Sequence, residues 1–145
     1  MGSGEDEEKL KKMSSELEVD KYLYFLGYRN DIQNLMSQLD LIVLSSLWEG
    51  LPLTPIEAFS VGKTIIATAV DGTVEIVKDR ENGMLIPPKK VDAISNSINY
   101  IIENPNIREK YENNAKICYY REFTEMMFYL KIVNYYTEVC LTHEI

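Results

Sequence analysis

Residues that bind metals or act as catalytic nucleophiles are scarce in this sequence. Its 145 residues include two cysteines, Cys118 and Cys140, and one histidine, His143. Cys140 and His143 have the spacing of half a zinc site, but no second pair of ligands completes it. A Ser-His-Asp or Cys-His mechanism would depend on His143, which lies near the end of the chain, where chains usually fray. We therefore expect no metal, no histidine-based catalysis and two free cysteines in a reducing compartment.

Long apolar runs and an excess of basic residues are missing as well. No stretch approaches the ~18 apolar residues of a membrane span. The acidic start around Glu5 and Asp6 lacks the apolar part of a secretory signal, so we expect a cytoplasmic protein. The 15 Lys and Arg stand against 23 Asp and Glu, which gives a net charge of −8. This balance disfavours nucleic acid as a partner, because phosphates are bound by clustered basic residues.

The overall composition is that of an ordinary globular protein. With 46% hydrophobic and 26% charged residues, the chain resembles one ordinary domain over residues 1–145. Apolar runs predict about four strands, whereas three- and four-residue spacing predicts helices between and after them. We expect a Rossmann-like parallel sheet with flanking helices and a helical C-terminal segment. The expected strands are 22–26, 41–44, 64–68 and 84–86, and the expected helices are 5–18, 32–39, 54–61, 91–103, 107–118 and 124–141. Residues 71–73 are expected to form a turn, which could start a short helix through Ile76.

The stretch 45–59 is the strongest candidate for a binding site. It joins a buried strand to a helix, and open α/β sheets bind ligands beyond the carboxyl ends of their strands. Gly50 permits close approach of backbone to a ligand, and the helix start offers N–H groups to phosphate oxygens. Glu49 and Glu57 would flank this position with carboxylates that accept hydrogen bonds from sugar or ribose hydroxyls.

Glu57 and Trp48 also have purely structural interpretations. Thr54-Pro55-Ile56-Glu57 has the pattern of a capping box, in which Thr54 is the N-cap and Glu57 bonds back to it. Local physics favours this capping role for Glu57 over a ligand role. Trp48 could stack on a base, but we expect it to cover the edge of the core.

Several motifs in a fixed order resemble one enzyme family. Glu49 and Glu57 are spaced as E-x7-E, and further matches lie at Phe25-Leu26-Gly27-Tyr28, 39–46, 62–68, 71–77 and 81–87. Together these motifs resemble the group 1 retaining nucleotide-sugar glycosyltransferases of the GT-B fold. The resemblance covers most of the chain and identifies it as part of the C-terminal, donor-binding domain. Asp71-Gly72 stands where that family usually has two glycines.

The resemblance implies a role for each site residue. Glu49, the catalytic candidate, would accept hydrogen bonds from hydroxyls of the donor sugar. The backbone N–H groups of Gly50, Leu51 and Leu53 would line the sugar and diphosphate, and Thr54 would face the phosphates. Glu57 would bind the ribose, and the backbone near Gly27 and Tyr28 would meet the base. Such enzymes transfer the sugar with retention, and neither a bound metal nor a cofactor is implied.

The family's remaining parts are not found in this sequence. Its glycine-rich loop, its diphosphate-binding Lys and Arg and its acceptor-binding N-terminal domain would all lie upstream of residue 1. We therefore expect a truncated chain that is inactive by itself, or alternatively a non-catalytic subunit that docks onto a separate acceptor-domain chain. The family's last helix crosses to that missing domain, which predicts an exposed apolar patch at residues 126–129. Peripheral membrane association of the complete enzyme is implied as well.

Overall fold

A computed structural model describes residues 4–142 of the chain. The chain divides into two compact units, residues 1–32 and 33–145. In the first unit, helix α1 (Glu7–Glu16) is followed by a 3-10 turn, η1 (Asp20–Tyr22). The buried Ser14 joins them, because its Oγ donates a hydrogen bond to Asp20 Oδ1 at 2.7 Å.

The predicted strand at 22–26 is wrong. The residues after Tyr22 form no strand, and all five side chains of this run are exposed. Aromatic and aliphatic residues favour strands, but a strand also needs a partner for its N–H and C=O groups. Residues 4–32, the described part of this unit, contain no strand that could serve as that partner.

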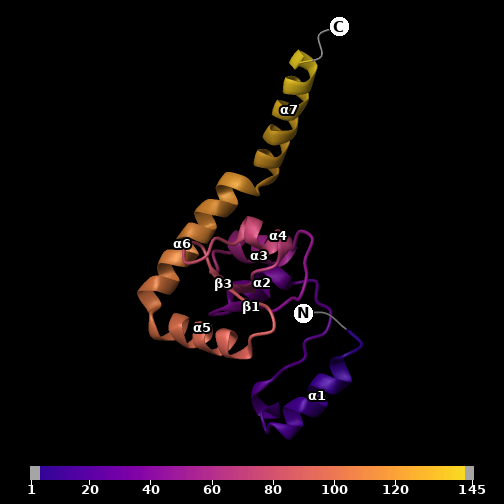
Figure 1. Cartoon of the computed structure of the whole chain (residues 1–145), viewed down its shortest axis with the longest axis vertical. Helices are drawn as coiled ribbons and strands as arrows, with labels where there is room; N and C mark the ends of the chain where they lie inside the picture. The colour runs from indigo at the N-terminus through magenta and orange to yellow at the C-terminus, as the bar shows by residue number, and fades with distance from the viewer. Residues whose placement is uncertain (1–3, 143–145) are drawn as a thin grey trace. The chain divides into compact units, whose positions relative to one another are not determined.

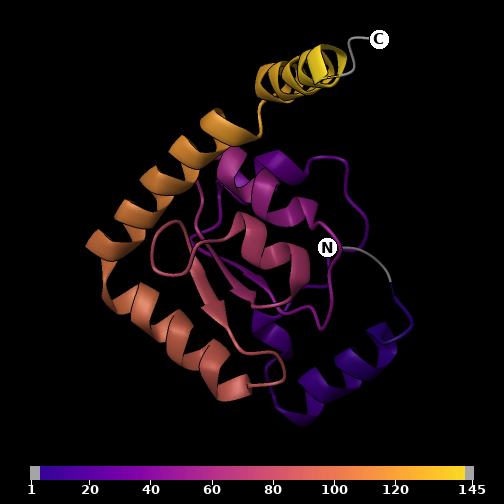
Figure 2. The same ribbon diagram turned by 45° about the horizontal axis from the view of Figure 1, so that its top comes forward.

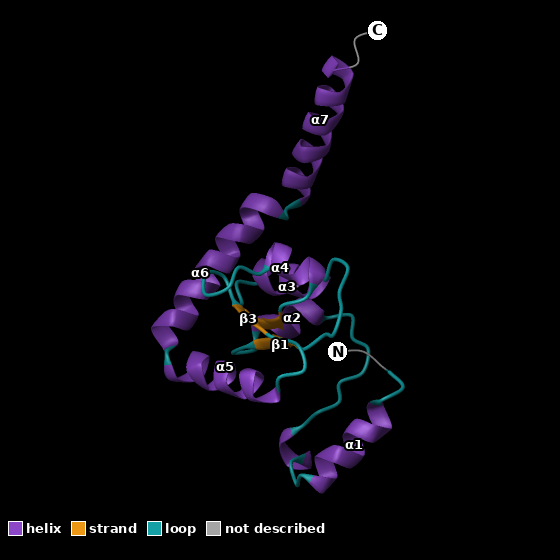
Figure 3. Cartoon of the chain, in the orientation of Figure 1, coloured by secondary structure: helices purple, strands orange, loops and turns teal. Residues whose placement is uncertain are grey.

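The second unit contains the parallel sheet and its helices (Figure 3). The α/β fold class and the predicted strands at 41–44, 64–68 and 84–86 are confirmed, so the described sheet has three strands rather than four. The elements in chain order are α2 (Ile32–Ser37, which begins at the last residue of the first unit), β1 (Ile42–Leu44), α3 (Leu53–Ser60), β2 (Ile65–Thr68), α4 (Asp71–Ile76), β3 (Met84–Ile86), α5 (Val91–Glu103), α6 (Pro105–Glu122) and α7 (Glu125–Thr142).

The sheet has the strand order β1-β2-β3, with Ile42 paired to Ile65 and Ile66 to Met84. All four residues of the central strand β2 are buried, as expected for a parallel strand covered on both faces. Helices α3 and α4 lie on one face of the sheet and α5 on the other (Figures 1 and 2). The core on the α5 side includes Ile66, Met84, Ile86, Ile101 and Tyr111.

The last two helices meet at a short break between Glu122 and Glu125. Thr124 Oγ1 accepts a hydrogen bond from the Met127 N–H at 3.3 Å, which caps the start of α7. The predicted exposed apolar patch is confirmed for Met126, Phe128 and Tyr129, each 62–65% exposed. None of the helices that the structure describes has the length and hydropathy of a membrane span.

Candidate functional site

Hydroxyl groups anchor the loop of residues 45–52, which follows the carboxyl end of β1 and precedes α3. The Oγ1 of buried Thr68, at the end of β2, donates a hydrogen bond to the Ser46 carbonyl oxygen at 2.5 Å. Ser46 Oγ in turn donates to Glu49 Oε1 at 2.6 Å. The position of the Glu49 carboxylate is therefore connected to the central strand through two short hydrogen bonds.

The same loop contacts helix α4 through backbone atoms. The Gly72 N–H donates a hydrogen bond to the Glu49 carbonyl oxygen at 3.3 Å. A Cβ atom placed on Gly72 would lie 1.8 Å from the Gly50 carbonyl oxygen, so no other residue fits without moving the loop. A Cβ on Gly50, in contrast, would have no atom within 4 Å. Gly72 is required for this contact, whereas the space beside Gly50 is open.

The predicted capping box at the start of α3 is wrong. The helix begins at Leu53 with Pro52 as its N-cap, and no side chain caps it. Glu57 is therefore five residues beyond the N-cap, whereas a capping box needs three. The half-buried Glu57 carboxylate is not used by the helix and is free to accept a ligand hydroxyl.

The start of α3 leaves backbone donors available for an anion. Pro52 and Pro55 have no N–H group, so the helix presents the N–H groups of Leu53 and Thr54. Within residues 4–142, neither of these donors has a hydrogen-bond acceptor, and the same holds for the N–H groups of Gly50 and Leu51. Such N–H groups at a helix start form a seat for phosphate oxygens.

Six of the eight predicted site residues thus occupy one loop and the helix after it. Gly27 and Tyr28 belong to the first unit, where Gly27 has a φ of +59° and Tyr28 is 82% exposed. Their contact with a base stays a prediction. Trp48 does not cover the core as predicted, because its side chain is 80% exposed. An exposed aromatic ring next to Glu49 is free to stack on a ligand.

The sequence analysis missed Ser46, Thr68 and Gly72. The signal for the first two was a hydroxyl residue at or shortly after the carboxyl end of each of two adjacent strands, because Thr68 ends β2 and Ser46 lies two residues after β1. For Gly72, the sequence indicated only that the family usually has a glycine at this position. Its contact with Gly50 joins segments that are far apart in the sequence.

The two cysteines lie on α6 and α7, outside this loop. Cys118 and Cys140 are free thiols, and burial raises the pKa of Cys118. Among residues 4–142, no three His, Cys, Asp or Glu side chains are grouped as metal ligands. His143, the other half of the Cys140-x-x-His143 pattern, lies outside the described residues.

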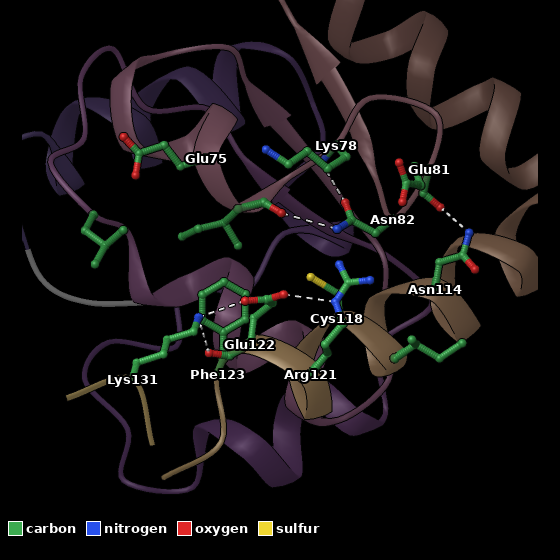
Figure 4. Close-up of a pocket in the computed structure, with 13 residues that line it drawn as sticks. Glu75, Lys78, Glu81, Asn82, Asn114, Cys118, Arg121, Glu122, Phe123 and Lys131 are labelled. Atoms are coloured by element: carbon green, nitrogen blue, oxygen red, sulfur yellow. Dashed lines mark hydrogen bonds and ion pairs between the residues drawn. The ribbon is translucent and has the colours of Figure 1, made fainter. Parts of the chain in front are cut away.

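A separate cavity of about 320 Å³ lies between α4, the turn before β3 and the α6–α7 break (Figure 4). Asn82, at its wall, accepts from the Lys78 N–H at 2.8 Å and donates to the Ile76 carbonyl oxygen at 3.2 Å. Lys131 and Arg121 both pair with Glu122 (Figure 4). Leu51 of the 45–52 loop also lines the cavity. Three of the charged side chains that line the cavity, Arg121, Glu122 and Lys131, thus pair with one another.

Known proteins resemble the chain in sequence and in fold. The family model for glycosyl transferases group 1 matches residues 1–117. A UDP-Gal:α-D-GlcNAc-diphosphoundecaprenol α-1,3-galactosyltransferase from Escherichia coli is 37% identical over 68% of this chain and 26% of its own length. This chain spans about a quarter to a third of the length of the first curated relatives that it matches, namely 26%, 35% and 31%.

Two solved structures illustrate the shared fold. HepE from Anabaena, in complex with UDP-glucose, superposes with a TM-score of 0.86 at 27% identity, over 93% of this chain and 38% of that one. The C-terminal domain of LpcC, a group 1 family protein from Francisella tularensis, gives 0.74 at 26% identity, over 85% of this chain and 66% of that one. This chain therefore belongs to the group 1 family of glycosyl transferases and has the fold of its C-terminal domain.

Proposed function

We propose that this chain is the donor-binding part of an enzyme that transfers a sugar from a nucleotide-diphosphate sugar to an acceptor with retention. One observation carries the proposal. Two carboxylates and four unpartnered backbone N–H groups gather at the carboxyl end of β1, at the family's E-x7-E spacing. The donor itself requires both kinds of group, because its hydroxyls donate hydrogen bonds and its diphosphate accepts them.

The geometry supports a distinct task for each group. Glu49, oriented by Ser46, accepts from hydroxyls of the donor sugar. Glu57, one turn into α3, accepts from ribose hydroxyls. The N–H groups of the loop and of the helix start stabilise the diphosphate as it leaves with the electrons of the glycosidic bond. In this proposal the base lies near Gly27 and Tyr28.

The diphosphate also needs positive charge that this segment does not supply. Residues 45–57 contain no Lys or Arg. The helix end contributes only a partial positive charge. We infer that basic residues outside this segment complete the site, together with an acceptor-binding domain. The acceptor would be bound by that domain.

Calorimetry on the full chain tests the donor assignment. UDP-glucose is the first probe, since HepE is solved with it, and GDP-glucose and ADP-glucose complete the panel. We expect one nucleotide to give saturable heat and Glu57→Ala to weaken its binding at least about tenfold, the loss of a charge-assisted hydrogen bond. Glu109→Ala, an exposed glutamate on α6, is the matched control and should bind as wild type. No heat with any nucleotide sugar, or equal affinity for Glu57→Ala, would contradict the assignment.

Retention of the anomeric configuration is tested on the product of the transfer reaction. The chain is combined with its acceptor-binding domain, and the anomeric configuration of the transferred sugar is read by NMR coupling constants. Retention predicts the same configuration as in the donor, and the opposite configuration would exclude it.

The exposed apolar side chains of α7 favour a second candidate, a subunit that docks onto a separate acceptor-domain chain. Sugar transfer by this chain alone would exclude that candidate. Binding of a donor without transfer, followed by transfer once an acceptor-domain chain is added, would support it. The name of the E. coli relative states a lipid-linked acceptor. An acceptor of that kind would bring the enzyme to a membrane surface, whether the acceptor-binding domain is on the same chain or on a separate one.

A further inference from the structure

Asp71 is an additional carboxylate beside the proposed donor-sugar position. It is exposed and is the first residue of α4, directly after the turn that follows β2. The next residue, Gly72, donates its N–H to the Glu49 carbonyl oxygen at 3.3 Å. The backbones of Asp71 and Glu49 are therefore neighbours, although 22 positions separate them in the sequence. A charge at the start of α4 acts over a Debye length of about 8 Å at physiological salt.

The loop after β1 and helix α4 themselves carry negative charge only, and the first cation beyond them, Lys78, donates from its Nζ to the Val74 carbonyl oxygen at 3.1 Å. Residues 45–57 and 68–77 contain Glu49, Glu57, Asp71 and Glu75 but no Lys, Arg or His. Like charges at this range repel, and they repel more strongly where a bound ligand displaces water. A carboxylate on the sugar ring would therefore be disfavoured here in a way that a hydroxyl would not.

Asp71 also has a plain structural role. An acidic side chain in the first turn of a helix interacts favourably with the positive end of the helix dipole. That role affects the stability of α4 equally with every ligand. It does not discriminate between a neutral and an acidic sugar on the same nucleotide. A change in the ratio of the two affinities therefore reports on a role in donor selection and not on the stability of α4.

We propose that Asp71 makes the donor site selective for uncharged sugars and excludes donors of the uronic-acid type. This inference rests on the proposed function, since it needs the sugar at Glu49. The discrimination acts through charge and does not require contact. It should therefore weaken as salt concentration rises.

The test compares two donors that differ at one carbon, UDP-glucose and UDP-glucuronate. Calorimetry measures both on wild type, Asp71→Asn, Asp71→Glu and Glu75→Gln, each checked by thermal unfolding. Wild type should bind UDP-glucose at least about tenfold more tightly. Asp71→Asn should gain about three- to tenfold for UDP-glucuronate and stay within twofold for UDP-glucose. Asp71→Glu, which keeps the charge, should retain most of the wild-type discrimination.

Glu75→Gln removes a charge from the same helix one turn further on. It should change the donor ratio less than Asp71→Asn does, and an equal gain would overturn the assignment to Asp71. An unchanged ratio in Asp71→Asn, with UDP-glucose still bound, would overturn this inference alone. Absence of binding by UDP-, GDP- and ADP-glucose to wild type would instead overturn the proposed function.

Discussion

The amide nitrogen of Gly72 lies 3.3 Å from the carbonyl oxygen of Glu49, and the two backbones touch there without an intervening side chain. This contact joins the loop after β1 to the helix after β2. The two loops meet because parallel strands place their carboxyl ends at one edge of the sheet. Glu49 is thus held from two sides, by Gly72 through its backbone and by Ser46 through its carboxylate.

Gly72→Ala and Gly50→Ala should separate a structural glycine from one that faces open space. A methyl group on Gly72 would overlap the Gly50 backbone, so we expect a loss of about 1–3 kcal/mol in the free energy of unfolding. On Gly50 the methyl group meets nothing, so stability should change by less than about 0.5 kcal/mol. Donor binding should fall in both variants. Urea unfolding and calorimetry measure the two quantities, and equal destabilisation by both substitutions would contradict the model of the contact.

Ser46→Ala should loosen the Glu49 carboxylate without unfolding the chain. The hydrogen bond from Ser46 Oγ to Glu49 Oε1 is lost, so the carboxylate samples more rotamers before a sugar binds. We expect a three- to tenfold weaker donor affinity, about 1 kcal/mol, with little change in stability. Ser95→Ala, which removes an exposed hydroxyl on α5, is the control. Wild-type affinity in Ser46→Ala would show that Glu49 needs no such support.

Asn82→Ala should destabilise the second unit. The buried amide satisfies the Lys78 N–H and the Ile76 carbonyl oxygen at the end of α4, and alanine leaves both without a partner. The expected cost is about 1–3 kcal/mol in the free energy of unfolding. Asn96→Ala, at an exposed position of α5, should cost less than about 0.5 kcal/mol. Similar unfolding midpoints for the two variants would rule out the structural role of Asn82.

The two thiols should react at different rates. Burial raises the pKa of Cys118 above its ordinary value, so less of it is thiolate, the reactive form, near neutral pH. Cys140 is exposed. We expect iodoacetamide to modify Cys140 first at pH 7.5, as followed by peptide mass spectrometry. The Cys118 rate should still rise with pH beyond about 8.5, the ordinary thiol value. Equal rates at pH 7.5 would refute the burial of Cys118.

Lys131→Met should raise the pKa of Glu122. Lys131 and then Arg121 lower that pKa by hydrogen bonding to the carboxylate. A lowered carboxyl pKa stabilises the fold above the ordinary value of about 4.3, and this contribution is lost as pH falls through the lowered value. NMR titration of the carboxyl carbon measures the shift. An unchanged pKa in the variant would show that the pair at the α6–α7 break does not form.

The three strands were predictable because each is a short apolar run between turn residues. Full burial followed only for the central strand β2, whereas Val43 in the edge strand β1 is exposed. The same reasoning failed at 22–26, where an apolar run has no strand partner among the described residues of its unit. It failed again at Thr54, because the N-cap of the helix is two residues earlier, at Pro52. Strand pairing and the exact start of a helix both depend on atoms outside the local pattern.

The sequence by itself determined the α/β class, the E-x7-E pair at Glu49 and Glu57, and the family to which those residues belong. Local periodicity and motif order are sufficient for these conclusions. Only the tertiary structure decided that Glu57 is free of the helix cap, that Ser46 orients Glu49, and that Gly72 must lack a side chain. The Gly72 contact joins loops more than 20 residues apart, because the sheet brings the ends of β1 and β2 to one edge. No local pattern in the sequence predicts that these two loops lie next to each other.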